Sequence, residues 1–184
     1  MEKAYDRIEW NFLLNYLWQL GFNDIWIRWI RECISTVSYS IIINDEPCGF
    51  LKPSRGLRQG DPLSPYLFIL CMDVLVRHLY NHSLTAKSGI GIKIAPTIVR
   101  IPCLLFADDN LMFYQATFEA CQHLKDILDI FCTQSGQLIN FHKSSIVFSK
   151  NTRSIGKQIV AGIFNILHSS SLRNIWDVAK SSPS

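Results

Sequence analysis

The chain has 184 residues, of which 48% are apolar and 18% are charged, and its formal net charge is only +3. This length suffices for one domain with a hydrophobic core, and the modest charge excludes a general polycation, so any nucleic-acid contact must come from local patches. No apolar run is long enough to span a membrane, and the six cysteines form no C-x-x-C pair. We therefore expect an intracellular protein without a membrane segment and without disulfide partners.

Apolar periodicity and turn residues predict helices and short strands along the chain. The predicted elements, in chain order, are a helix between residues 6 and 21, a helix from 23 or 24 to about 34, strands at 38–44 and 49–52 joined by a turn at 45–47, a helix from 64 to about 79, a loop or strand at 89–94, two apolar strands flanking residues 108–110, a helix at 118–132, a strand at 144–149 and a helix at 154–167. This mixture predicts an α+β fold in which helices pack on one face of a small antiparallel sheet.

Particular residues mark the predicted helix ends. Asp6 followed three residues later by Glu9 is typical of a capping box, and Gly21 is placed to end that helix. Asn23 or Asp24 can cap the next helix. Ser64, followed by a proline at the first helical position, predicts a third helix start, and Gly136 follows the predicted end of a later helix.

Asp108 and Asp109 stand side by side between two apolar runs. Each run is predicted to be a short buried strand, and the Asp-Asp-Asn step is predicted to be the turn between them. Adjacent carboxylates repel each other unless a cation offsets their charge, and Mg²⁺ prefers such oxygen ligands. Ordinary turn chemistry, in which Asp and Asn tolerate a tight backbone, is the alternative.

A second segment with chemical character covers residues 53–65, which contain two glycines and two arginines and lead directly into a predicted helix. Glycines allow close approach of the backbone to a ligand, a helix N-terminus attracts anions, and arginine pairs with phosphate. This composition favours a loop that binds a nucleotide or a nucleic-acid backbone. A plain loop before a helix is the alternative.

Four segments carry a family resemblance, namely residues 2–10 (EKAYDRIEW), 56–65 (GLRQGDPLSP), 106–109 (FADD) and 135–144 (SGQLINFHKS). In this order they resemble the palm of a reverse transcriptase, and more narrowly that of plant-like LINE-type (non-long-terminal-repeat) retrotransposons. The resemblance implies a partial reverse transcriptase (palm) domain over residues 1–150, with fingers and thumb largely missing. It fades beyond residue 153, so residues 151–184 are expected to be a degenerate segment, partly helical or frayed.

The resemblance implies an RNA-directed DNA polymerase of the nucleus that uses an RNA template, a DNA primer and deoxynucleotide triphosphates. Asp108 and Asp109 would hold the catalytic Mg²⁺ ions, for which Mn²⁺ can substitute. The other implied roles are exclusion of the sugar 2′-hydroxyl by Tyr5, nucleotide and template binding by Arg58, Gln59 and Gly60, shaping of the primer end by Phe106 and Ala107, and contact of Lys143 with the pyrophosphate, with proton donation.

The family carries a third aspartate immediately before the residue that aligns with Met1. Two-metal phosphoryl transfer needs carboxylates from both sides of the site, so we expect the isolated chain to be inactive or nearly so. Two alternatives are a remnant that binds nucleic acid through Lys52, Arg55 and Arg58 without chemistry, and a retrotransposon relic with no selected function.

Overall fold

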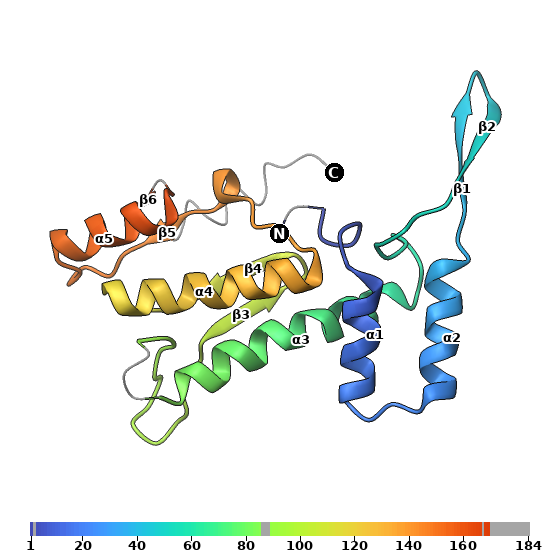
Figure 1. Ribbon diagram of the computed structural model, residues 1–184. Coiled ribbons are helices and arrows are strands. Elements are labelled where there is room, and N and C mark those ends of the chain that lie inside the picture. The colour runs from blue at the N-terminus through green and yellow to red at the C-terminus, as the bar shows by residue number, and fades with distance from the viewer. Residues whose placement is uncertain (2, 86–88, 167, 170–184) are drawn as a thin grey trace. The chain divides into compact units, whose positions relative to one another are not determined.

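A computed structural model describes residues 1, 3–85, 89–166 and 168–169 (Figure 1). Its elements, in chain order, are α1 (Trp10–Gln19), α2 (Asp24–Ser35), β1 (Tyr39–Ile43), β2 (Glu46–Leu51), α3 (Ser64–Ser83), β3 (Cys103–Phe106), β4 (Asp109–Met112), α4 (Phe118–Ser135), the 3-10 helix η1 (Phe141–Lys143), β5 (Ile146–Val147), α5 (Ser154–Phe164) and β6 (His168–Ser169). The predicted α+β class is confirmed. Glu2 of the first motif, the predicted last helical residue Leu167 and residues 170–184 of the predicted C-terminal segment lie outside the described residues.

The chain divides into two compact units. Unit 1 contains Met1–Arg77 and Ile130–Leu138, and unit 2 contains His78–Asp129 and Ile139–Ser184. The strands form separate two-stranded sheets: β1 with β2, β3 with β4, and β5 with β6. The first two pairs are antiparallel, as predicted, and the short β5–β6 pair is parallel. No helix within the described residues is long and apolar enough to cross a lipid bilayer.

In unit 1, α1 and α2 lie side by side and antiparallel (Figure 1). Gly21, with φ +83°, follows the end of α1, and the Asn23 side chain accepts a hydrogen bond from the backbone N–H of Ile25 at 2.8 Å, so both predicted end signals are confirmed. The apolar stripes of these helices, the part of α3 that belongs to unit 1, the segment before α1 and the end of α4 form the core. Its fully buried members in unit 1 include Ile8, Leu13, Leu17, Leu67, Cys71, Leu75 and Phe131.

The predicted start of the first helix was wrong. α1 begins at Trp10 after Glu9, whose side chain makes no capping hydrogen bond. Asp6 lies in a separate turn, in which its N–H donates to the Lys3 carbonyl at 3.0 Å. The carbonyl groups of Tyr5 and Ile8 accept long-range hydrogen bonds from Leu57 and Gly56, so they are not used in helical hydrogen bonds.

A polar link joins α1 to α3 inside unit 1. The Tyr16 hydroxyl donates to Asp73 at 2.5 Å, and the Arg77 guanidinium donates to the same carboxylate oxygen at 2.7 Å. Burial, together with the neighbouring Asp73 carboxylate, raises the pKa of Tyr16 to about 12. Burial alone would raise the pKa of Asp73, but the hydrogen bonds from Tyr16 and Arg77 outweigh it and hold that pKa below its usual value.

Replacing Tyr16 by phenylalanine is expected to lower the free energy of unfolding by roughly 2 kcal/mol, because a hydrogen bond to a charged acceptor is lost. The folded-state pKa of Tyr16 lies above its unfolded value of 10, so its contribution is fully present below pH 10 and is lost as the pH rises towards 12. Urea unfolding of both proteins across this range should show their difference shrinking. A difference that stays constant to pH 12 would contradict this role.

β1 and β2 form a hairpin whose turn is Asn44-Asp45, with φ of +50° and +65°. Positive φ at both central residues is the signature of a type I′ turn, which suits the twist of a hairpin. The predicted turn at residues 45–47 is therefore displaced, because Glu46 and Pro47 already belong to β2. Every residue of both strands is exposed, and the hairpin extends beyond α2 (Figure 1).

In unit 2, isolated bridges pair Ile90 with Tyr114 and Ile92 with Ile101, so the predicted strand region around residues 89–94 continues the β3–β4 hairpin. The ring of Tyr114 contacts that of Phe164 from α5, with centroids 5.8 Å apart. Cys121, Leu124 and Val160 are also buried in this unit, as are Leu79, Ile90, Ile127 and Leu128. The predicted helices of this region are confirmed in type and start, although α4 continues to Ser135 and α5 already ends at Phe164.

Candidate functional site

The segment between the N-terminal turn and α1 pairs with the glycine-rich loop. The N–H of Gly56 donates to the Ile8 carbonyl, and the N–H of Leu57 donates to the Tyr5 carbonyl, both at 2.8 Å. The indole N–H of Trp10 donates to the Gly56 carbonyl at 2.6 Å. Gly56 has φ +89°, and a Cβ there would lie 2.7 Å from the Asp6 carbonyl oxygen, so this position requires glycine.

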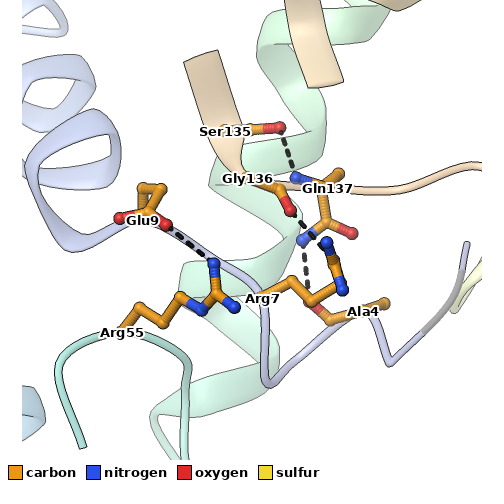
Figure 2. Close-up of polar contacts among 7 residues, drawn as sticks. All are labelled: Ala4, Arg7, Glu9, Arg55, Ser135, Gly136 and Gln137. Atoms are coloured by element: carbon orange, nitrogen blue, oxygen red, sulfur yellow. Dashed lines mark hydrogen bonds and ion pairs between the residues drawn. The ribbon is translucent and has the colours of Figure 1, made fainter. Parts of the chain in front are cut away.

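The same segment also contacts the residues that follow α4 (Figure 2). The Gln137 amide donates to the Ala4 carbonyl at 2.7 Å, and the Arg7 guanidinium donates to the Gly136 carbonyl at 3.1 Å. The N–H of Glu9 donates to the Ser135 carbonyl at 2.9 Å. Three segments of the sequence motifs, residues 4–10, 55–60 and 135–137, therefore meet in unit 1; we call this meeting point the motif junction.

Side-chain burial and charge reinforce the motif junction. Gln137 is only 2% exposed, and its Oε1 has no hydrogen-bond partner among the described residues. The Glu9 carboxylate forms an ion pair with Arg55 at 3.3 Å (Figure 2). Because this ion pair is partly exposed, we expect it to contribute little to stability, and the buried backbone hydrogen bonds to hold the junction.

Four of the predicted site residues belong to unit 1. The half-buried ring of Tyr5 stacks on that of Phe68, with centroids 4.8 Å apart and an interplanar angle of 11°. The amide of Gln59 donates to the Asp6 carboxylate at 3.3 Å. Gly60 has φ +83°, and a Cβ there would meet nothing within 4 Å. Arg58 is exposed beside it.

A pocket of about 280 Å³ lies in unit 1 between the loop, the end of α2 and the start of α3. Its polar lining residues include Asp6, Tyr39, Arg55, Arg58, Asp61 and Ser64. Two guanidinium groups, two carboxylates and two hydroxyls make it suited to a polar ligand with both anionic and donor groups. Tyr5, Gln59 and Gly60 are not among the residues that line this pocket.

The remaining predicted site residues belong to unit 2. In the β3–β4 hairpin, Phe106 pairs with Asp109, so the two-residue turn is Ala107-Asp108. The predicted Asp-Asp-Asn turn was therefore wrong: the turn begins one residue earlier and ends two residues earlier, because Asp109 and Asn110 already pair with β3. Ala107 has φ +51°, a strained value for a residue with a side chain.

The prediction that both strands of this hairpin are buried was also wrong. Cys103 is buried, but the three following residues of β3 are exposed, and Phe106 is 79% exposed. A two-stranded hairpin has no second layer on one face to cover it. The Asn110 side chain donates to the Asp108 carbonyl at 3.4 Å, and its buried Oδ1 has no partner within the described residues.

Lys143 is the last residue of η1 and is exposed. The Asn140 side chain caps this short helix by accepting from the Lys143 N–H at 3.1 Å. The sequence predicted a strand start near this position, and the strand β5 begins instead at Ile146. In the part of the chain that the structure describes, no three His, Cys, Asp or Glu side chains are grouped closely enough to form a complete metal site.

Comparison with known proteins adds independent findings. Residues 1–167 match the family model described as reverse transcriptase (RNA-dependent DNA polymerase). The chain is similar to an uncharacterized mitochondrial protein of Arabidopsis thaliana (54% identity over 69 residues, 38% of this chain and 56% of that protein). It is also similar to a retrovirus-related Pol polyprotein from a type-1 retrotransposable element R2 of Popillia japonica (26% over 147 residues, 80% and 23%).

A further relative is an uncharacterized 149 kDa protein of transposon TX1 from Xenopus laevis, with 24% identity over 144 residues that cover 78% of this chain and 10% of that protein. The chain thus spans about half of the plant protein and a quarter or less of the two retroelement proteins.

Proposed function

Because the chain belongs to the reverse transcriptase (RNA-dependent DNA polymerase) family, we propose that it forms the palm of an RNA-directed DNA polymerase with Asp108 and Asp109 as metal ligands. The observation that carries the proposal is the family match over residues 1–167, which includes the acidic hairpin turn and all three segments of the motif junction. The proposed substrates are an RNA template, a DNA primer and deoxynucleotide triphosphates.

The two carboxylates fit the donor set of the proposed metal. Mg²⁺ is usually bound by one or two carboxylates together with waters and substrate phosphates, and Mn²⁺ accepts the same oxygen ligands. Asp108 and Asp109 are adjacent at an exposed hairpin end, where a polyphosphate could complete the ligand set. When bound, such ions would lower the pKa of the primer 3′-hydroxyl and stabilise the charge on the leaving pyrophosphate.

The motif junction supports the proposed role of Tyr5. Its ring is held by Phe68 and its carbonyl by Leu57, while the preceding carbonyl of Ala4 is held by Gln137. A ring fixed in this way can exclude a sugar 2′-hydroxyl by steric contact, because moving it would break several interactions at once.

The loop and the positively charged side chains have proposed binding roles. The space where a Cβ of Gly60 would lie is open, and Gln59 is oriented by Asp6, so both can contact the nucleotide and the template. Arg58 lines the pocket of unit 1 and can pair with phosphate. The exposed ammonium of Lys143 is proposed to meet the pyrophosphate and to donate a proton, and Phe106 and Ala107 are proposed to shape the primer end.

We expect residues 1–184 alone to give no RNA-templated primer extension in Mg²⁺ or Mn²⁺, because two-metal transfer needs carboxylates from both sides of the site and no third acidic side chain is grouped with Asp108 and Asp109 within the described residues. A chimera in which this chain replaces its matched segment in the Popillia japonica relative should extend the primer. Robust extension by the isolated chain would contradict its expected inactivity. A folded chimera that does not extend would contradict the proposed polymerase function.

A non-catalytic nucleic-acid-binding remnant is the second candidate. Its cations would be Lys52, Arg55 and Arg58, which are exposed, although Arg55 is already paired with Glu9. A filter-binding titration at two salt concentrations should show steep salt dependence if these cations neutralise phosphates. A relic without a selected function would give neither binding nor a functional chimera.

Residence in the nucleus stays a prediction. The plant relative is named as a mitochondrial protein, so the localisation of a fluorescent fusion of this chain would distinguish the two compartments.

A further inference from the structure

The β1–β2 hairpin exposes an unusual amount of apolar surface. All five residues of β1 and all six of β2 are exposed, including Ile42 at 72% and Phe50 at 68%. Within the described residues, no other strand pairs with the outer edge of β1. An isolated two-stranded hairpin is only marginally stable in water, and an uncovered apolar edge strand is a template for pairing with another chain.

The two outer edges of this hairpin differ in their ability to pair. β1 has the sequence YSIII, without charge or proline, whereas β2 begins with Glu46 and Pro47. The pair that closes a two-residue turn, here Ile43 with Glu46, is hydrogen-bonded, so the next pair, Ile42 with Pro47, is not. The N–H of Ile42 therefore faces the outer edge of β1, and at the corresponding place on β2 the proline has no N–H to offer.

We infer that β1 is an interaction surface that pairs with β1 of a second copy of this chain, joining two hairpins into one four-stranded antiparallel sheet. Pairing centred on Ile41 places Ile41 opposite its own copy, Tyr39 opposite Ile43 and Ser40 opposite Ile42, so apolar and aromatic side chains meet at the centre and at both ends of the strand. This pairing is self-complementary, as a two-fold symmetric interface requires.

Charge selects the antiparallel orientation. The hairpin has an acidic end, Asp45-Glu46, and a basic base, where Lys52 directly follows β2. Antiparallel pairing sets the acidic end of one hairpin beside the basic base of the other. Parallel pairing would set the two acidic ends side by side, where their charges repel each other.

Proline limits the assembly to two copies. After β1 has paired with its copy, both outer edges of the new sheet are β2 strands, and each carries Glu46 and Pro47. A charged residue and a missing donor are the features by which natural edge strands resist further pairing. The sheet therefore closes as a dimer and does not grow into a ladder.

Sedimentation velocity of residues 1–184 under reducing conditions, over a wide range of concentration, tests this inference. The expected result is a monomer–dimer equilibrium. Ile42→Pro removes one outward N–H from each copy without removing a bond between β1 and β2. It should weaken association roughly 30-fold, the equivalent of about 2 kcal/mol for two hydrogen bonds. Ile42→Lys, which puts a charge on the same edge, should also favour the monomer.

The matched control is Phe50→Lys, which places the same charge at a similarly exposed position of the other strand. It should leave the dimer largely intact. Hydrogen exchange supplies a local readout, since the Ile42 amide should become protected as concentration rises in the wild-type chain but not in Ile42→Lys. A monomer at every concentration, growth beyond a dimer, or equal weakening by the changes at Ile42 and Phe50 would overturn the inference.

Discussion

Replacing Gly136 by alanine is expected to lower the free energy of unfolding by about 3 kcal/mol. Gly136 has φ +75°, and a Cβ there would overlap the Arg7 carbonyl oxygen and lie 2.9 Å from Cγ of Glu9. The Arg7 backbone and the Glu9 side chain at the start of α1 would both have to move to make room for this Cβ, and neither can move easily. The change should therefore separate residues 135–137 from residues 4–10 and open the motif junction, which urea unfolding can measure.

Gly60→Ala is the matched control for this prediction. Gly60 has φ +83°, close to that of Gly136, but a Cβ there would meet nothing within 4 Å. Only the backbone strain remains, so the expected loss is about 1 kcal/mol. Equal losses for the two variants would mean that the close approach of Gly136 to Arg7 does not constrain the fold.

Replacing Asp108 and Asp109 together by asparagine is expected to reduce RNA-templated extension by the chimera at least about 10³-fold. Asparagine keeps the size of each side chain but removes the negative charge that would hold the metal ions. Primer extension under single-turnover conditions is the appropriate measurement, because it reports the chemical step without product release.

The other hairpin supplies a control for charge alone. Asp45 and Glu46 are also adjacent acids at a two-residue turn, and both are exposed. Asp45→Asn combined with Glu46→Gln removes the same charge from the chimera and should leave extension unchanged. If both double variants lose activity equally, the effect of Asp108 and Asp109 is not one of metal ligation.

Local signals in the sequence predicted several helix ends and the buried side of α2. Gly21 and Asn23 act within one helical turn of themselves, so their roles at the ends of α1 and α2 could be predicted and are confirmed. The apolar periodicity that predicted α2 agrees with the burial of Ile30 and Ile34 in that helix. The glycine after α4 was also predicted, but only as a helix end.

The motif junction could not be predicted because its contacts are long-range. Gln137 and Ala4 are 133 residues apart, and Trp10 and Gly56 are 46 apart, so no local pattern signals that they touch. Asp6 and Glu9 have the spacing of a capping box, yet tertiary hydrogen bonds place one beside Gln59 and the other beside Arg55. Tertiary contacts of this kind override the local preference of a sequence for a helix start.

The β3–β4 hairpin illustrates a different limit. The adjacent acids located the turn to within two residues, but the register depends on which apolar residues face each other across the strands. Apolar character predicted burial of Leu104 and Phe106, which are exposed. A continuous apolar run indicates that a strand is suited to burial, but it does not identify the element that would pack on it.

Paramagnetic line broadening by Mn²⁺ in isotope-labelled residues 1–184, with a nucleoside triphosphate present, measures whether Asp108 and Asp109 bind the metal. We expect that the amide signals of residues 107–110 broaden first, that Asp108→Asn with Asp109→Asn abolishes the effect, and that Mg²⁺ reverses it by competition. Signals near Asp45 should persist at the same Mn²⁺ concentration. Broadening that is equal at the two acidic turns, or that survives the asparagine replacements, would contradict the assignment of Asp108 and Asp109 as the metal ligands.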